Sequence, residues 1–145
     1  MIAYNYRMDA IQGAILRVKL RRAEQWTEQR RRIAALYRER LGNLPLRRTD
    51  EAAGRRHVYH IFSVFHPERD RLQAFLAERG IQTGKHYPIP LHLQQCYAHL
   101  GHRKGDFPAS ERVGDEQLSL PLYPEMPDAD VELVTQAIGD WLGSA

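Results

Sequence analysis

The chain has 145 residues, enough to bury a core, and its 43% hydrophobic and 27% charged residues are typical of a globular protein. No apolar run approaches the roughly 20 residues of a membrane-spanning helix, and the first residues lack the apolar stretch of a signal peptide. The net charge is only +3, and the single cysteine, Cys96, excludes an internal disulfide framework and fits a reducing cytoplasm.

A long helix is the first predicted element. Apolar residues at helical spacing predict one long helix, or two helices joined end to end, at about 6–42 with one apolar stripe against a core. The stripe is formed by these residues: Met8, Ile11, Ile15, Val18, Ile33, Leu36, Tyr37 and Leu41. Gly42 and Pro45 mark its end, because glycine commonly follows the last turn of a helix and proline does not continue it.

The remaining surface of this helix is basic. Arginine and lysine far outnumber glutamate between residues 17 and 40, and such a surface suits nucleic acid, phosphate or an acidic partner. However, no compact recognition helix follows, and aromatic residues for base stacking are absent from this surface. We therefore expect a solvated face or a subunit interface, and no nucleic-acid or membrane partner.

Short elements fill the middle of the chain. Residues 47–56 are polar and predict a loop, whereas 57–65 are rich in β-branched and aromatic residues and predict the clearest strand. Residues 69–79 predict a helix that ends at Gly80, and 81–83 a second short strand.

The second half repeats this alternation. We expect a helical turn at 93–100, a helix from Pro108 to about 117, a proline-stiffened strand at 118–124 and a last helix at 127–142. Helices packed on a small sheet make an α+β layer, and the whole chain, 1–145, is expected to be one domain.

The segment Thr83–His92 is unusual for its two prolines. Pro88 and Pro90 fix two backbone angles, remove two hydrogen-bond donors and push the preceding residues towards extended geometry. The result is a stiff strap that carries His86, Tyr87 and His92. Imidazole and phenol groups on a rigid backbone suit ligand contact or proton handling.

A zinc site is one alternative for the strap and the residues after it. The spacing of His92, Cys96, His99 and His102 supplies four side chains that can bind zinc. Structural zinc sites favour small folds with little core, and this chain has a sizeable core of its own. We therefore expect no metal, and interpret the cluster as a surface loop.

Other catalytic signatures do not occur in the sequence. No serine lies in a G-x-S-x-G context, and there is no Walker loop or G-x-G-x-x-G. The residues alone therefore indicate a binding strap without a recognisable catalytic centre.

Three segments together resemble one enzyme family. Residues 4–9 (Tyr-Asn-Tyr-Arg-Met-Asp), the strap from Gly84 to His92, and the runs Gly-Asp-Phe-Pro at 105–108 and Leu-Ser-Leu-Pro-Leu-Tyr-Pro at 118–124 resemble motifs of the DegT/StrS sugar aminotransferases. They occur in the same order, so the resemblance extends over the whole chain.

The resemblance implies a fold and an activity. Members look like homodimeric fold-type I enzymes that use pyridoxal 5'-phosphate. They transfer an amino group, usually from glutamate, to a nucleotide-linked keto sugar that is used for surface polysaccharides or antibiotics. This chain resembles their C-terminal portion: a long interdomain helix plus a small α+β domain with a mostly antiparallel sheet covered by helices.

The resemblance also implies residue roles. Asn5 matches an asparagine that reaches the cofactor phosphate of the partner subunit, and Arg7 lies near the same interface and the substrate entrance. His86, Tyr87 and His92 match strap residues on the sugar-nucleotide side. Ala3 stands where the family usually has glycine.

The family's cofactor lysine has no counterpart here. It belongs to the large domain, N-terminal to residue 1, and none of Lys19, Lys85 and Lys104 has its sequence context. Because Schiff-base chemistry needs that lysine, we expect no catalytic residue in this chain and no transamination by it alone. A truncated product, one half of a split gene and a non-catalytic dimerisation or regulatory module remain open.

Overall fold

The computed structural model describes residues 8–143 and begins with one long helix, α1 (Ala10–Arg40). The Asp9 carboxylate accepts a hydrogen bond from the Ile11 N–H at 2.7 Å and caps the first turn. Leu41 caps the other end, immediately before Gly42. The predicted single long helix and its end are therefore confirmed.

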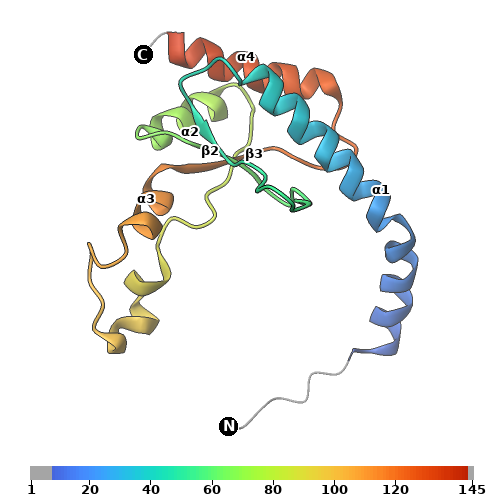
Figure 1. The fold of residues 1–145 in the computed structure, drawn as a ribbon, viewed down its shortest axis with the longest axis horizontal. Helices are drawn as coiled ribbons and strands as arrows, with labels where there is room; N and C mark the ends of the chain where they lie inside the picture. Colours follow the sequence, from blue (N-terminus) through green and yellow to red (C-terminus); the bar gives the residue numbers. More distant parts are fainter. Residues whose placement is uncertain (1–7, 144–145) are drawn as a thin grey trace.

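The two halves of α1 have different surroundings. Figure 1 shows the helix curving away from the rest of the molecule towards its N-terminal end. Only the second half enters the core, where Ile33, Ala34 and Tyr37 are buried. The prediction that the whole apolar stripe faces a core is wrong for the first half, because the sheet and α4 do not extend that far. The large apolar side chains there are 52–74% exposed: Met8, Ile11, Ile15, Leu16, Val18 and Leu20.

The sheet has three antiparallel strands in the order β1-β2-β3: β1 (Arg47–Arg48), β2 (Phe62–Phe65) and β3 (Gln117–Leu120). Phe62 pairs with Leu120 and Phe65 with Gln117. Beyond β3, Gly84 forms an isolated antiparallel bridge with Ser119. The predicted small antiparallel sheet is confirmed.

Three strand predictions need correction. Within 57–65 only the last four residues form a strand, because Tyr59 has a φ of 48°, a left-handed conformation that interrupts an extended chain. Residues 81–83 form no strand, and pairing is limited to the bridge at Gly84. β1 lies in a segment that was predicted to be a loop. No pattern in the sequence indicated this strand, because it has only two residues and exists through its pairing with β2.

The remaining helices are α2 (Arg69–Glu78), α3 (Pro108–Glu116) and α4 (Asp128–Gly143), all at predicted positions. In place of the helical turn at 93–100 there are two 3-10 turns, η1 (Leu91–Leu93) and η2 (Gln95–Leu100). No helix among residues 8–143 has the length and apolar character needed to cross a bilayer.

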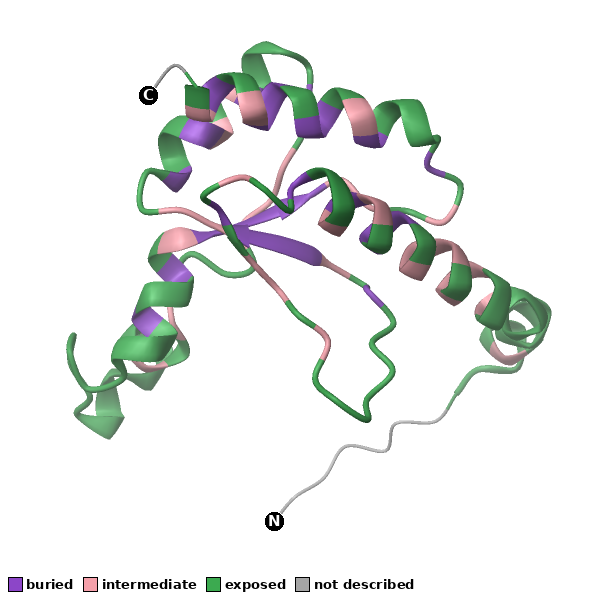
Figure 2. Ribbon diagram, turned by 45° about the horizontal axis from the view of Figure 1, so that its top comes forward, coloured by how far each residue is buried: buried purple, intermediate pink, exposed green. Residues whose placement is uncertain are grey.

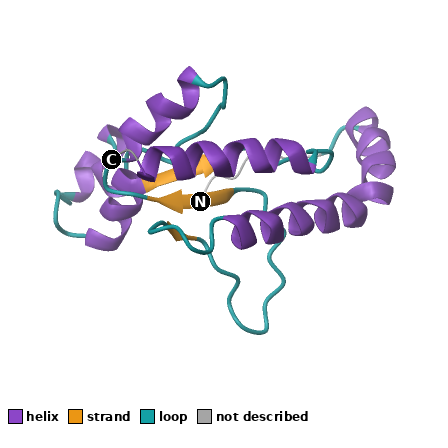
Figure 3. Cartoon of the chain, turned by 90° about the horizontal axis from the view of Figure 1, so that it is seen from above, coloured by secondary structure: helices purple, strands orange, loops and turns teal. Residues whose placement is uncertain are grey.

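The core lies where the second half of α1, the sheet, α2 and α4 meet. Figure 2 shows buried residues along the strands and on the sheet side of α4, and Figure 3 shows helices enclosing the small sheet. The Phe62 and Tyr37 rings stack at 5.1 Å in its centre. Residues 84–107, which we call the arm, project from this body and return through α3 (Figure 1).

Candidate functional site

Three of the five predicted site residues lie in the arm. His86, Tyr87 and His92 belong to the strap, which leaves the edge of β3 at Gly84 and ends in η1. Asn5 and Arg7 lie outside the described residues, so their roles stay predictions. The site can therefore be built from the strap and from the elements that hold it.

Two residues of β3 hold His86. Its backbone N–H donates to Oε1 of Gln117 at 2.8 Å, and its ring Nδ1 lies 2.9 Å from the Ser119 hydroxyl. The Gln117 amide nitrogen is 2.6 Å from that hydroxyl and 2.7 Å from the hydroxyl of Ser63 on β2. Because Ser63, Gln117 and Ser119 are all buried, these hydrogen bonds exchange little with water and fix the imidazole against the sheet.

His86 lines an open pocket, and Tyr87 follows it in the strap. Tyr87 is 72% exposed, and its ring centroid is 5.4 Å from that of His86 in an edge-on arrangement. The pocket, of about 290 Å³, has His86, Gly84 and Ser119 along one side. Its other lining residues are His60, Ile61, Gln82, Thr83, Leu120, Pro121 and Leu122. Two imidazoles, polar side chains and apolar walls around one hollow suit a polar ligand with a flat or apolar part.

His92 occupies a different environment. Its Nε2 is 2.9 Å from Oε1 of Glu111, and its ring packs on Phe107 at 4.8 Å. Glu111 also accepts hydrogen bonds from the Gly105 N–H at 2.8 Å and from the Phe107 N–H. The structure therefore brings His86 and Tyr87 together, but places His92 in a separate contact inside the arm.

The electrostatics of Glu111 follow from these contacts. Burial alone would raise the pKa of this carboxyl, but the Gly105 N–H, His92 and the Phe107 N–H favour the charged form, and the net pKa is lowered. Glu111 is therefore ionised near neutral pH and joins the strap end, the 101–107 loop and α3.

The strap prolines rest on α3. A Cβ at Gly114 would lie 3.2 Å from Cδ of Pro90 and 3.3 Å from the carbonyl oxygen of Pro88. Only a residue without a side chain permits this close approach without displacement of the strap. Gly114 thus sets the height of the strap above α3.

Sequence reasoning missed the four supporting residues Gln117, Ser119, Glu111 and Gly114. Gln117 and Ser119 are at alternate positions of β3 and share one face, but the predicted strand began at residue 118 and Gln117 was assigned to the end of the preceding helix. A buried polar face in a strand indicates a hydrogen-bonded network. Glu111 and Gly114 carried no comparable signal.

Within residues 8–143 no three potential metal ligands come together. His92 bonds to Glu111, and His99 to the carbonyl of Cys96 at 3.2 Å. His102 lies 3.6 Å from Asp106. The described residues thus offer no support for the zinc alternative.

The three lysines do not form a Schiff-base site. Nζ of Lys85 pairs with Asp70 at 2.6 Å, and this contact contributes most to the lowered pKa of Asp70. Lys19 lies on α1 and Lys104 in the exposed 101–107 loop. A cofactor lysine must present its amine to the cofactor aldehyde in an enclosed site; the described residues thus offer a wall for a ligand, not an anchor for pyridoxal phosphate.

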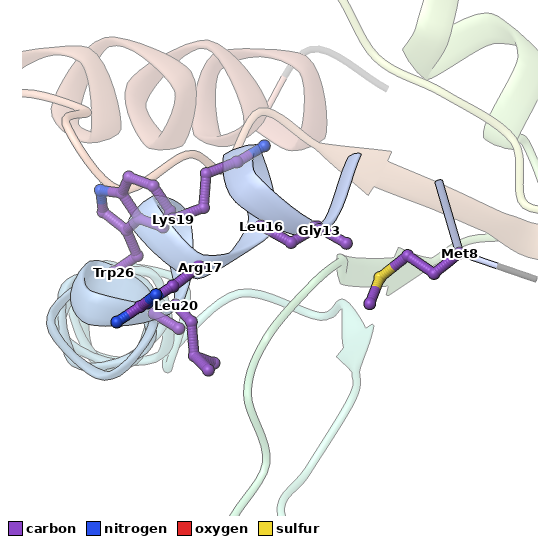
Figure 4. A pocket seen from close by; sticks show the side chains of 8 residues that line it. Met8, Gly13, Leu16, Arg17, Lys19, Leu20 and Trp26 are labelled. Carbon is purple, nitrogen blue, oxygen red and sulfur yellow. The ribbon is translucent and has the colours of Figure 1, made fainter. Parts of the chain in front are cut away.

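A second hollow lies far from the strap, on the first half of α1. Figure 4 shows Leu16, Leu20 and Trp26 beside Arg17 and Lys19, with Met8 facing the same space. It is an open apolar groove of about 580 Å³ with basic side chains at its rim. Its composition suits a protein contact more than a small polar ligand.

Comparison with known proteins agrees with the motifs. The model of the DegT/DnrJ/EryC1/StrS aminotransferase family matches residues 1–139. A pleiotropic regulatory protein of Geobacillus stearothermophilus is 43% identical over 97% of this chain and 39% of its own length. The dTDP-3-amino-3,6-dideoxy-alpha-D-galactopyranose transaminase of Aneurinibacillus thermoaerophilus is 41% identical over 92% of this chain and 36% of its own length.

Solved structures show the same relationship. DesV of S. venezuelae superposes with a TM-score of 0.91 at 34% identity over 94% of this chain and 37% of its own. A family aminotransferase from Brucella abortus gives 0.89 at 36% identity over 98% and 38%. The chain thus spans less than two fifths of these relatives, and its fold is that of the small domain of a fold-type I sugar aminotransferase. It belongs to the DegT/DnrJ/EryC1/StrS aminotransferase family.

Proposed function

We propose that this chain is the small domain, over residues 1–145, of an aminotransferase that moves an amino group from glutamate to a nucleotide-linked keto sugar for cell-surface polysaccharides or antibiotics. Enzymes of the family depend on pyridoxal 5'-phosphate, which supplies the amino-group chemistry when bound. The exposed free thiol of Cys96 supports a cytoplasmic location.

In this proposal the chain binds and orients the substrate. His86 contacts the sugar nucleotide at its pocket, Tyr87 contacts it from the neighbouring strap position, and His92 closes the strap from the arm side. Asn5 contacts the cofactor phosphate of the partner subunit in a homodimer, and Arg7 lies at the substrate entrance. The chain alone does not transaminate, because Lys85 is engaged with Asp70 and neither other lysine is enclosed.

One observation carries this proposal: the strap presents two exposed side chains from a backbone that is held on both sides. Gln117 and Ser119 fix its first end, and Gly114 fixes its prolines. Side chains held in this way lose little conformational freedom on binding, which is typical of a preorganised ligand wall.

Reconstitution tests the proposal. The chain is mixed with the remaining N-terminal part of the Aneurinibacillus transaminase, and amino transfer from glutamate to a dTDP-linked keto sugar is followed with pyridoxal phosphate present. We expect activity only in the mixture, and we expect His86→Ala and Tyr87→Ala to raise KM for the sugar nucleotide. The matched control is His99→Ala, which changes an exposed histidine outside the strap.

Two results would overturn the proposal. One is transamination by the chain alone, with borohydride fixing pyridoxal phosphate onto Lys85. The other is a reconstituted enzyme whose KM for the sugar nucleotide does not respond to either strap variant.

A second candidate function is pairing without catalysis, as a dimerisation or regulatory module. The groove on α1 favours it, because three large apolar side chains that line it, Met8, Leu16 and Leu20, are more than half exposed. Contiguous apolar surface of this kind marks a protein contact. A pleiotropic regulatory protein among the relatives is consistent with such a role.

Association measurements separate this candidate from the first. A double variant, Leu16→Ser with Leu20→Ser, removes two apolar side chains that line the groove and is expected to abolish binding to a full-length relative in sedimentation velocity. The control changes Leu133, an exposed apolar residue of α4, to Ser. Unchanged association in the double variant would exclude pairing through α1.

A further inference from the structure

The hydrogen bonds beneath His86 fix the orientation of the Gln117 side-chain amide. The backbone N–H of His86 can only donate, so the Gln117 side-chain atom that faces it at 2.8 Å must be the amide oxygen. The amide nitrogen of Gln117 then faces the hydroxyls of Ser63 and Ser119, at 2.7 and 2.6 Å. Both hydroxyl oxygens therefore act as acceptors towards Gln117.

This arrangement bears on which ring nitrogen of His86 carries the hydrogen. The Ser119 oxygen already accepts from Gln117, and its own hydrogen faces His86 Nδ1 at 2.9 Å. If Nδ1 carried a hydrogen, the Ser119 hydroxyl would direct its own hydrogen elsewhere, and no hydrogen bond recorded among residues 8–143 gives that hydrogen another acceptor. The arrangement in which Nδ1 accepts and the ring hydrogen lies on Nε2 pairs the Ser119 hydrogen, and it is favoured for that reason.

The geometry points to a role for this relay: we propose that Gln117 and Ser119 are positioning residues that hold His86 as the neutral Nε2–H tautomer. Nε2 lies on the ring side opposite to the serine, and the structure records no partner for it among residues 8–143. His86 then offers one N–H donor at the pocket beside Gly84 and Leu122.

If the Nε2–H of His86 is fixed as a donor, the ligand atom that binds there must be a hydrogen-bond acceptor. A neutral imidazole with Nε2–H binds an acceptor oxygen, either a hydroxyl or carbonyl oxygen of the sugar or a phosphate oxygen, without adding a charge. This step rests on the proposed function, which places the nucleotide sugar at His86. The relay itself depends only on the contacts within this chain.

Nitrogen-15 NMR of the histidine rings tests the relay on the chain itself. At a pH of about 8.5, above the ordinary histidine pKa of about 6.5, His86 is expected to show a protonated Nε2 and a bare Nδ1. His86→Gln assigns the signals. Ser119→Ala should restore the tautomer mixture of an exposed histidine, whereas the control Ser110→Ala, an exposed serine of α3, should not.

Gln117→Glu is the sharper variant. Its carboxylate still accepts from the His86 N–H but cannot donate, so the Ser119 hydroxyl turns to it and accepts from Nδ1–H instead. The tautomer should therefore reverse. Ser119→Ala keeps the test valid if the buried carboxylate prevents folding. An Nδ1–H ring or a tautomer mixture in the unaltered chain would overturn the relay.

The donor role has its own readout in the reconstituted enzyme. Ser119→Ala is expected to raise KM for the sugar nucleotide by about three- to tenfold, in line with one lost hydrogen bond, with kcat little changed. If Ser119→Ala gives a mixture of His86 tautomers but leaves KM for the sugar nucleotide unchanged, the donor role would be overturned. Failure of every strap variant to affect the reconstituted enzyme, with His86 still the Nε2–H tautomer, would count against the proposed function and leave the relay intact.

Discussion

The body and the arm of this small domain are held together by different forces. The body is organised around large buried side chains, among them Phe62 and Ile138, which have no exposed surface. In the arm neither 3-10 turn contains a buried residue, and Tyr87 and Leu91 are 72% and 67% exposed. Apolar burial sets the free energy of unfolding, whereas a few directional contacts set the position of the arm. Substitutions in the arm should therefore cost less stability than substitutions in the body.

The largest expected contrast compares a core ring with an arm ring. Phe62→Ala should lower the free energy of unfolding by about 3–5 kcal/mol, because it removes a fully buried ring stacked on Tyr37. Tyr97→Ala, in the arm, should cost about 0.5 kcal/mol or less. Urea unfolding followed by circular dichroism measures both. Equal losses would mean that the arm is part of the cooperative core.

The junction between body and arm should show an intermediate effect. The buried Arg69 guanidinium donates to the carbonyls of Gly114 and Gln117, at 3.1 and 2.8 Å. Arg69→Ala leaves both carbonyls without this donor and should cost about 1.5–3 kcal/mol. The matched control is Arg71→Ala in the same helix, an exposed residue that should change stability by less than about 0.5 kcal/mol.

Acid should release the arm before it unfolds the body. The pKa of Glu111 is lowered in the folded state, so its contribution is present above the unfolded carboxyl pKa of about 4.3 and is lost as pH falls through the folded value. Amide exchange in residues 101–107 should then accelerate while that of β2 stays slow. Glu111→Gln should remove this step; an acid response that persists in the variant would assign it to another group.

The smallest effect is expected at Gly114. Gly114→Ala gains helix propensity of about 1 kcal/mol but places a methyl group 3.2 Å from Pro90, so the net change in unfolding free energy should stay below about 1 kcal/mol while strap amide shifts change. Gly139→Ala on α4, where a Cβ meets nothing within 4 Å, should stabilise without moving the strap. Unchanged strap shifts in Gly114→Ala would show that the prolines do not rest on α3.

Local patterns in the sequence predicted the helices well, because their signals lie within each segment. The start of α3 at Pro108 follows from the backbone preference of a single residue, and α1 ends just before Gly42, as the sequence predicted. The strands were predicted less well. β1 exists only through its pairing with β2, and the left-handed turn at Tyr59 depends on a ring buried against Phe62.

The candidate site shows the same division. The strap and its exposed residues His86 and Tyr87 could be identified from two prolines and from a family resemblance. The relay beneath them could not, because Ser63 and Ser119 are 56 positions apart and meet only through the register of β2 and β3.

The sequence by itself thus determined the order of helices, the stiff strap and the family to which the chain belongs. Only the tertiary structure decided which half of α1 is buried, which histidine lies at the open pocket and which is bound by Glu111. The physical reason is that propensity and backbone restriction act between near neighbours, whereas burial and hydrogen-bond partners are supplied by residues that are distant along the chain.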